Sequence, residues 1–188
     1  MEIALMIMVA QGVLGAFDTL YYHEYVYRLP IHGPKVGGEL QLHAFRDFVY
    51  GTLFLTLPFV KWQGLLALVL GLLIVLEICI TIWDFNIEVI ERAEIGGVAN
   101  EERGLHLIMA VVYGFFLAHF IPNLWNWVSL PTGFSSQEEL LPWIMIVCVF
   151  FGIGVILSGI RDLAASRGLK TFQVDLFGRG ASDDVSVT

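Results

Sequence analysis

The stretch ELQLHAFRDFVYG at residues 39–51 returns 63 residues later as ERGLHLIMAVVYG at residues 102–114. Each copy contains a glutamate, a histidine four residues later and then a Val-Tyr-Gly sequence. A glutamate and a histidine four residues apart lie on one face of a helix, so each copy directs a carboxylate and an imidazole at the same neighbour. Both copies begin apolar stretches, where an unpaired ionisable side chain costs roughly several kcal/mol. The repetition therefore indicates a site built from two similar halves.

The composition is that of a membrane protein. The chain has 188 residues, of which 57% are hydrophobic, and a mean hydropathy of +0.75, far more apolar than a soluble domain of this length. Five apolar windows approach the roughly 20 residues that a helix needs to cross the hydrocarbon core. We therefore predict an all-α, polytopic membrane protein with a five-span domain at residues 1–163 and a polar cytoplasmic tail at 164–188. The windows are residues 3–22, 40–60, 64–83, 105–125 and 141–160.

The correspondence between the first four spans extends beyond the Glu/His motif. Gln11 corresponds to Glu77 and Asp18 to Asp84, at a common offset of 66 residues. The first and third spans run in the same direction, so the repeats are parallel. We expect a pseudo-twofold four-helix bundle of two helical hairpins, with the fifth span packed outside it and free of buried charge. The repeats cover about residues 3–60 and 64–127, and the fifth span covers about residues 139–161.

The basic residues predict the orientation. Lys61 is the only basic residue on one side of the expected membrane, and the basic residues of the other connections and of the tail all lie on the opposite side. The positive-inside rule then places the N-terminus outside and the C-terminus in the cytoplasm, in a cell inner (plasma) membrane. The net charge of −8 gives no reason to expect a nucleic-acid partner. The basic residues on that opposite side are Arg28, Lys35, Arg92, Arg103, Arg161, Arg167, Lys170 and Arg179.

The depth of each polar residue can be worked out from the turn at Trp62 between the second and third spans. At 1.5 Å per residue, Asp84 lies about 33 Å from this turn and Glu39 about 34 Å, so the two are level. By the repeat, Asp18 should be level with Glu102 and His106. One layer near the cytoplasmic end then holds all the predicted metal ligands. These are Asp18, Glu39, His43, Asp84, Glu102 and His106, with His23, Glu24 and Glu88 as alternates.

The predicted ligands suggest the metal. Carboxylate oxygen and imidazole nitrogen suit iron, and also zinc or manganese. Cys79 and Cys148 have no C-x-x-C spacing, which argues against a cysteine-based zinc site. Two divalent cations would neutralise four carboxylates, whose mutual repulsion in a low-dielectric bundle otherwise opposes the ionisation of all four. We therefore predict a site for two metal ions, with iron as the first choice.

Four further residues are predicted to take part in catalysis. Asp47 and Glu88 lie next to the ligand layer and are the first candidates for proton delivery. Tyr50 and Tyr113 follow their motif histidines by seven residues, which places them about 10 Å deeper in the membrane. There they would border a pocket for a substrate.

At these residues the chain resembles the ferritin-like di-iron carboxylate proteins. Their bundles place an acidic ligand on each of two helices and a Glu-x-x-His pair on each of the other two. The resemblance covers roughly residues 10 to 115. It implies oxygen activation at two irons, an electron donor in the cytoplasm and a lipophilic substrate from the bilayer. The chain departs from the family in the four-residue Glu/His spacing and in its aspartates at Asp18 and Asp84.

Three other interpretations fit parts of the pattern. His43 and His106 are level on parallel spans and could be axial ligands of haem b or of chlorophyll-type pigments, although a glutamate one turn from each fits this poorly. The polar residues could instead form a purely structural network, with Arg46 and Asp47 as a salt bridge, in a subunit of a larger membrane complex. A transporter would need its site near the midplane, where only Glu77 lies.

Overall fold

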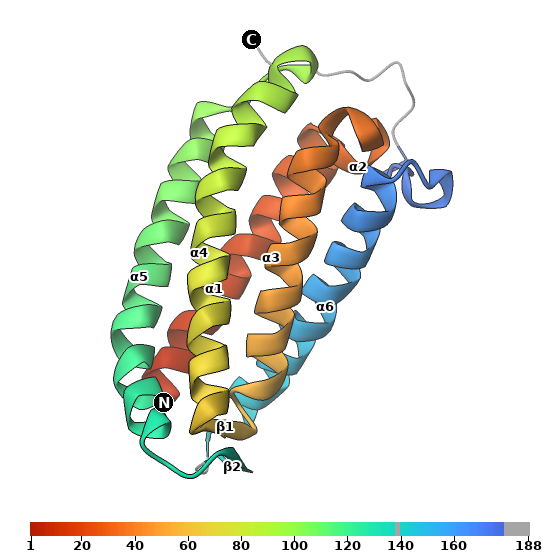
Figure 1. The fold of residues 1–188 in the computed structure, drawn as a ribbon. Helices are drawn as coiled ribbons and strands as arrows, with labels where there is room; N and C mark the ends of the chain where they lie inside the picture. Colours follow the sequence, from red (N-terminus) through yellow and green to blue (C-terminus); the bar gives the residue numbers. More distant parts are fainter. Residues whose placement is uncertain (138–139, 179–188) are drawn as a thin grey trace.

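The computed structural model describes residues 1–137 and 140–178, and the protein is 80% helical, which confirms the predicted all-α class. Five long helical segments run along the molecule and are joined by short elements at its ends (Figure 1). The long segments are α1 (Glu2–Phe17) with its continuation η1 (Asp18–Val26), α3 (Gly37–Thr56), α4 (Leu65–Glu91), α5 (Asn100–Val128) and α6 (Pro142–Ser166). The short elements are α2 (Leu29–His32), η2 (Gly33–Val36), β1 (Val60–Gln63), η3 (Arg92–Ile95), β2 (Gly133–Ser136) and η4 (Lys170–Phe172).

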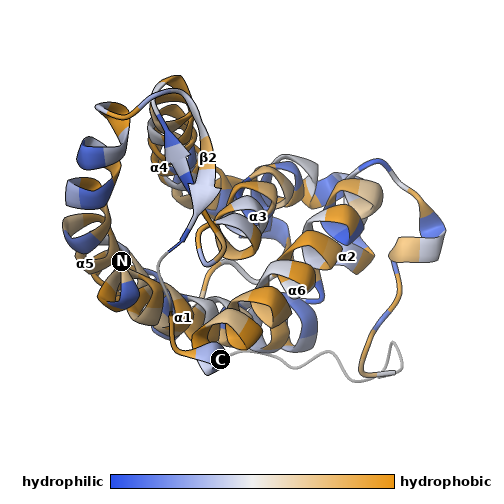
Figure 2. Cartoon of the chain, turned by 90° about the horizontal axis from the view of Figure 1, so that it is seen from below, coloured by the Kyte–Doolittle hydropathy of each residue, from blue (hydrophilic) through white to orange (hydrophobic). Residues whose placement is uncertain are grey.

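The long helices form a closed ring in the order α1, α5, α4, α3, α6 and back to α1, as the end-on view of Figure 2 shows. Successive long helices run antiparallel, so η1, η3 and the first turns of α3 and α5 gather at one end, drawn uppermost in Figure 1. We call this the upper end. The N-terminus of α1 and the β1–β2 pair lie at the lower end. The predicted repeat and its pseudo-twofold axis remain a prediction.

Four helical segments among the described residues are long and apolar enough to cross a membrane: Glu2–Val26, Leu65–Ile95, Asn100–Val128 and Pro142–Ser166. Large apolar side chains such as Ile90 and Phe150 face outward from the bundle, as in a protein surrounded by lipid. The remaining long helix, α3, was predicted as a span of the same kind, but it carries three charged residues between its first turn and its middle and does not reach this composition. It packs between α4 and α6, which keep most of its polar residues away from the outer surface.

The prediction for the fifth span is wrong in two respects. Helix α6 packs along the whole of α3 instead of lying outside the bundle, and it carries a buried charge, Asp162. Small residues allow this close packing: a Cβ at Gly159 would lie 3.1 Å from the backbone oxygen of Ala44 on α3. The helix also continues to Ser166, past the predicted end at residue 161.

Two connections at the lower end pair as strands. Val60–Gln63, expected as a simple turn, lies antiparallel to Gly133–Ser136, with Lys61 opposite Ser135. This ties the α3–α4 connection to the α5–α6 connection. Four-residue strands are too short to show alternation in a sequence, so only their turn residues were recognisable. The neighbouring residues 138 and 139, at the predicted start of the fifth span, lie outside the described residues.

The first part of the predicted tail is attached to the upper end. Arg161 donates a hydrogen bond through Nη2 to the backbone oxygen of Val174 at 2.7 Å, and Arg28 donates through Nη1 to Asp175 Oδ2 at 3.3 Å. These bonds link the segment after α6 to α6 itself and to the start of α2. The rest of the predicted tail, residues 179–188, lies outside the described residues.

Candidate metal centre

A layer of carboxylates and histidines fills the centre of the bundle near its upper end. It draws residues from η1, α3, α4 and α5, and none of them is more than 7% exposed. We call it the carboxylate–histidine layer. Its members are Asp18, His23, Glu39, His43, Asp84, Glu88, Glu102 and His106.

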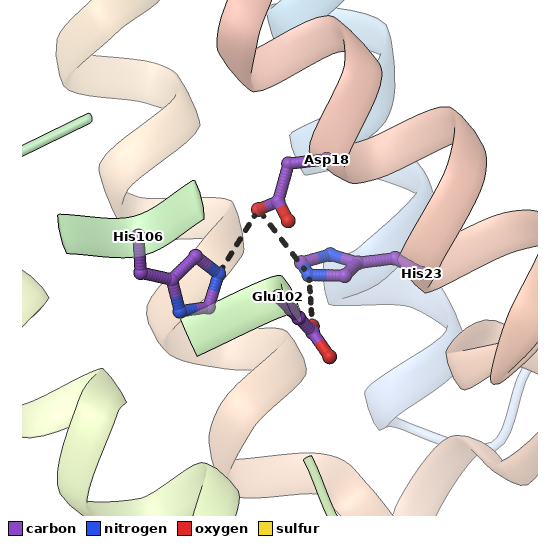
Figure 3. Close-up of side chains that lie close together, drawn as sticks. All are labelled: Asp18, His23, Glu102 and His106. Carbon is purple, nitrogen blue, oxygen red and sulfur yellow. Dashed lines mark hydrogen bonds and ion pairs between the residues drawn. The ribbon is translucent and has the colours of Figure 1, made fainter. Parts of the chain in front are cut away.

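Four of these residues form a group that could hold a metal ion (Figure 3). Asp18, His23, Glu102 and His106 each offer one ligand atom, and these atoms all lie within 4.8 Å of one another. Asp18 Oδ2 is 3.3 Å from His106 Nε2 and 3.5 Å from His23 Nε2. His23 Nε2 is in turn 3.6 Å from Glu102 Oε1. Two carboxylates and two imidazoles converging in this way match the donors that iron, manganese and zinc accept.

A stretch of π-helix brings His23 into this group. Residues Asp18–Val26 form η1, in which each N–H bonds five residues back, as Tyr27 N does to Tyr22 O at 2.9 Å. Residues five apart, such as Asp18 and His23, therefore point to the same side, which they would not do in an α-helix. The sequence offered His23 and Glu24 as replacements for Asp18. Instead, His23 joins Asp18, and Glu24 pairs with Arg161 of α6.

A second group lies beside the first. His43 Nε2 is 3.2 Å from Asp84 Oδ2 and 3.7 Å from Glu39 Oε1, so the residues that the depth comparison made level are in contact. Glu88 lies one turn beyond Asp84 on α4, and its Oε1 is 3.7 Å from His106 Nδ1 of the first group. The rings of His23 and His43 stack with centroids 4.6 Å apart. The two groups are therefore parts of one continuous layer.

Two arginines lie within the layer, and Arg92 was not predicted there. Arg92, counted as a loop charge, is fully buried and donates through Nε to Glu39 Oε1 at 2.7 Å and through Nη1 to Glu102 Oε1 at 2.6 Å. Arg46, expected to pair with Asp47, donates through Nη1 to Asp84 Oδ2 at 2.9 Å. The sequence does contain a pattern that indicates a buried Arg92. Asp84, Glu88 and Arg92 are spaced four residues apart, so they lie on the same face of one helix.

Tyr27 supports Arg92 from just outside the membrane-spanning segments. Its ring lies under the Arg92 guanidinium at 5.1 Å, and its hydroxyl accepts a hydrogen bond from Ala99 N at 2.8 Å. Burial, followed by the nearby Glu102 carboxylate, raises the pKa of Tyr27 above its usual value. The tyrosine is thus a neutral platform for the guanidinium.

The donor set of the layer fits divalent metal ions. Five carboxylates face two guanidinium groups, which leaves three negative charges uncompensated when the histidines are neutral. Each carboxylate also has one buried oxygen without a hydrogen bond. Such atoms cost about 1–3 kcal/mol each unless a proton or a cation satisfies them. They are Asp18 Oδ1, Glu39 Oε2, Asp84 Oδ1, Glu88 Oε2 and Glu102 Oε2.

The other predicted catalytic residues lie around the layer. Tyr50 and Tyr113 contact each other edge to face, with ring centroids 5.9 Å apart. Asp47 and Asp18 both line a cavity of about 250 Å³ between α1, α3 and α6. Asp162 of α6 was not predicted, and its Oδ2 lies 3.9 Å from His43 Nδ1. No pattern in the sequence marks Asp162, because it lies one residue past the predicted end of a span that has no counterpart in the repeat.

No protein-family model, curated protein or solved structure matches this chain.

Proposed function

We propose that this chain is a multi-pass membrane oxidoreductase with a di-metal centre, most readily di-iron, that acts on a lipophilic substrate. The observation that carries the proposal is the pair of adjacent carboxylate–histidine groups, buried inside the bundle, in which every carboxylate keeps one unpartnered oxygen. Buried carboxylates in this number are expected only with compensating cations.

The ligands divide naturally between two ions. Asp18, His23, Glu102 and His106 would hold the first, and Glu39, His43 and Asp84 the second. The predicted repeat relates Asp18 to Asp84, Glu102 to Glu39 and His106 to His43. His23 has no equivalent in it, so the two metal positions would differ in their ligands: two histidines at the first and one at the second.

Bound irons would supply the oxygen-activating redox chemistry, and the chain's own residues would hold the ligands in place. Arg92 bonds to both Glu39 and Glu102, so a single side chain fixes the carboxylates of the two halves relative to each other. The ring of Phe85 stacks on His106 at 4.8 Å between centroids, which fixes the plane of this imidazole. Glu88 and Asp47 are the residues placed to move protons, Glu88 at His106 Nδ1 and Asp47 at the cavity that also contains Asp18.

The proposed setting is a cell inner membrane with the N-terminus outside and the C-terminus in the cytoplasm. The layer lies at the upper end of the bundle, where the connections that carry most of the basic residues also lie. The positive-inside rule makes this the cytoplasmic end, within reach of a soluble electron donor.

One observation favours a second candidate, a structural ion-pair network in a subunit of a larger membrane complex. Arg92 and Arg46 already neutralise part of the layer, as expected of buried pairs that hold helices together. A haem is less favoured, because Nε2 of both His43 and His106 faces a carboxylate oxygen, at 3.2 and 3.3 Å.

Metal analysis of the purified full-length protein distinguishes these candidates. After anaerobic loading with Fe(II) and removal of free metal, elemental analysis should find about two irons per chain, and the visible spectrum should lack a Soret band. His43→Ala combined with His106→Ala should abolish this binding. His119→Ala is the matched control, because His119 is exposed on the same helix as His106.

Three outcomes would contradict the proposal. A Soret band would favour haem, absence of metal after loading would favour the structural network, and full metal content in the double variant would refute the ligand assignment. Circular dichroism of each variant shows whether the helices are retained, and Glu102→Gln tests the same centre with a smaller change in shape.

A further inference from the structure

A second group of buried polar residues lies deeper in the bundle than the carboxylate–histidine layer. It takes one residue from each of four helices: Gln11 of α1, Tyr50 of α3, Glu77 of α4 and Tyr113 of α5. We call it the inner polar cluster. Gln11, Glu77 and Tyr113 are 6%, 1% and 8% exposed. In an otherwise apolar part of the bundle these groups need hydrogen-bonding partners.

Three atoms of the cluster have no partner at good hydrogen-bond geometry within the protein: Gln11 Oε1, Glu77 Oε2 and the Tyr113 hydroxyl. The hydroxyls of Tyr50 and Tyr113 do lie near enough to the Glu77 carboxyl group to interact with it, and Tyr50 likewise lies near Gln11. The other Glu77 oxygen accepts a hydrogen bond from Thr81 Oγ1 at 2.9 Å, so only one side of the carboxyl group is satisfied. Unlike the layer above, the cluster contains no histidine and a single carboxylate, and it therefore makes a poor metal site. The three atoms instead suit a small polar group that can both donate and accept hydrogen bonds.

All four residues of the cluster line one cavity of about 280 Å³. Ile78 and Leu117 supply apolar wall, and Ile82 of α4 and Gly114 of α5 belong both to the lining and to the outer surface of the bundle. A Cβ at Gly114 would meet nothing within 4 Å, so this part of α5 leaves the wall open. The cavity thus reaches the lipid-facing surface between α4 and α5. It also reaches His106, a proposed metal ligand.

We propose that this cavity binds the substrate, and that the substrate is a long-chain alcohol. Its hydroxyl group would donate to Glu77 Oε2 or Gln11 Oε1 and accept from the Tyr113 hydroxyl, while its chain would pass between α4 and α5 into the bilayer. With two acceptors and one hydroxyl that both donates and accepts, the cluster favours a ligand that donates a hydrogen bond, which an alkane or a simple ketone does not. The identification of the ligand as the substrate rests on the proposed function, and the binding site rests on the three unpartnered atoms.

Photolabelling with a matched pair of probes tests this binding. The full-length protein in lipid nanodiscs is irradiated with 1-dodecanol or dodecane, each with a diazirine at the same chain position, and labelled peptides are mapped by mass spectrometry. The alcohol should label the cavity-lining segments of α4 and α5 around Ile78 and Leu117. Unlabelled 1-dodecanol should displace it, and dodecane should not.

Variants connect the labelling to the cluster. Tyr113→Phe removes one hydroxyl and keeps the ring, so it should weaken displacement by 1-dodecanol about twofold to tenfold, the range for one hydrogen bond. Glu77→Leu should weaken it at least as much, and Glu77→Gln, which keeps an acceptor, should restore it. Tyr21→Phe is the matched control, because Tyr21 is an exposed tyrosine outside this cavity.

Equal labelling by alcohol and alkane, or displacement unaffected by Tyr113→Phe, would overturn the inference. Labelling is measured with and without bound Fe(II), so that a failure of the alcohol-binding site can be distinguished from a failure of the proposed oxidoreductase function. Selective alcohol binding in a protein that takes up no metal would refute the oxidoreductase and leave the binding site. Two irons per chain without selective labelling would refute only the alcohol site.

Discussion

Replacement of Arg92 by methionine tests whether one buried cation joins the two halves of the carboxylate–histidine layer. Arg92 is 0% exposed and donates hydrogen bonds from Nε and Nη2 to Glu39 and from Nη1 to Glu102. Methionine is close in length and uncharged, so it fills much of the space and leaves both carboxylates without their common donor. Removing one member of a buried ion pair costs about 3–5 kcal/mol. For a chain of this size the metal-free variant should unfold on the order of 10 °C lower than wild type.

The assay is thermal unfolding in detergent, followed by tryptophan fluorescence, with and without Fe(II). Divalent ions bound to Glu39 and Glu102 would replace the missing positive charge, so the difference from wild type should shrink by about half or more when metal is present. Arg103→Met is the matched control, because Arg103 is an exposed arginine near the start of α5. A metal-free Arg92→Met protein within about 1 kcal/mol of wild type would refute the ion-pair reasoning. An equal loss with and without metal would refute the link between this arginine and the metal site.

Three further predictions concern the packing of the bundle and its ends. Gly159→Val places a Cβ 3.1 Å from a backbone oxygen of α3 and should lower the stability by about 1–3 kcal/mol in thermal unfolding, whereas Gly154→Val on the same helix, where a Cβ meets nothing within 4 Å, should change it little. Glu91→Ala removes the acceptor of two backbone N–H groups in the first turn of α3, at 3.2 and 3.0 Å, and should speed hydrogen exchange there about fivefold, by mass spectrometry; unchanged exchange would exclude this capping role. Arg161→Met removes the hydrogen bond to the segment after α6 and should make residues 170–178 more sensitive to limited proteolysis, and an equal effect of Arg167→Met, at an exposed arginine, would show that general charge loss is responsible.

The level of each polar residue could be predicted because a helix is a rigid rod with a fixed rise. Counting from Trp62 made Asp84 level with the Glu39/His43 motif, and the observed separation of His43 Nε2 and Asp84 Oδ2 is 3.2 Å. The repeat made the same prediction for Asp18 and His106, whose atoms lie 3.3 Å apart. The four-residue spacing of glutamate and histidine in each motif also predicted that the two side chains lie on the same face of their helix.

The residues that escaped prediction are those for which standard helix geometry or average charge rules do not apply. His23 reaches the layer only because η1 is a π-helix, and no local pattern in the sequence announces that change of period. Arg92 was predicted to be a charge of a cytoplasmic connection, because the positive-inside rule counts basic residues and does not distinguish exposed side chains from those buried inside the bundle. Asp162 depended on the position of α6 in the ring, which hydropathy alone does not fix.

The composition of α3 also bears on how the protein is made. A helix with a glutamate, an arginine and an aspartate between its first turn and its middle has little tendency to leave the translocation channel for lipid alone. The strongly apolar α4 follows after a connection of only eight residues. We therefore expect α3 to integrate only once α4 has been synthesised, so that the two enter the bilayer as one hairpin. When ribosomes are stalled just after α3 has been synthesised, we expect α3 of the nascent chain not yet to be integrated into the lipid bilayer.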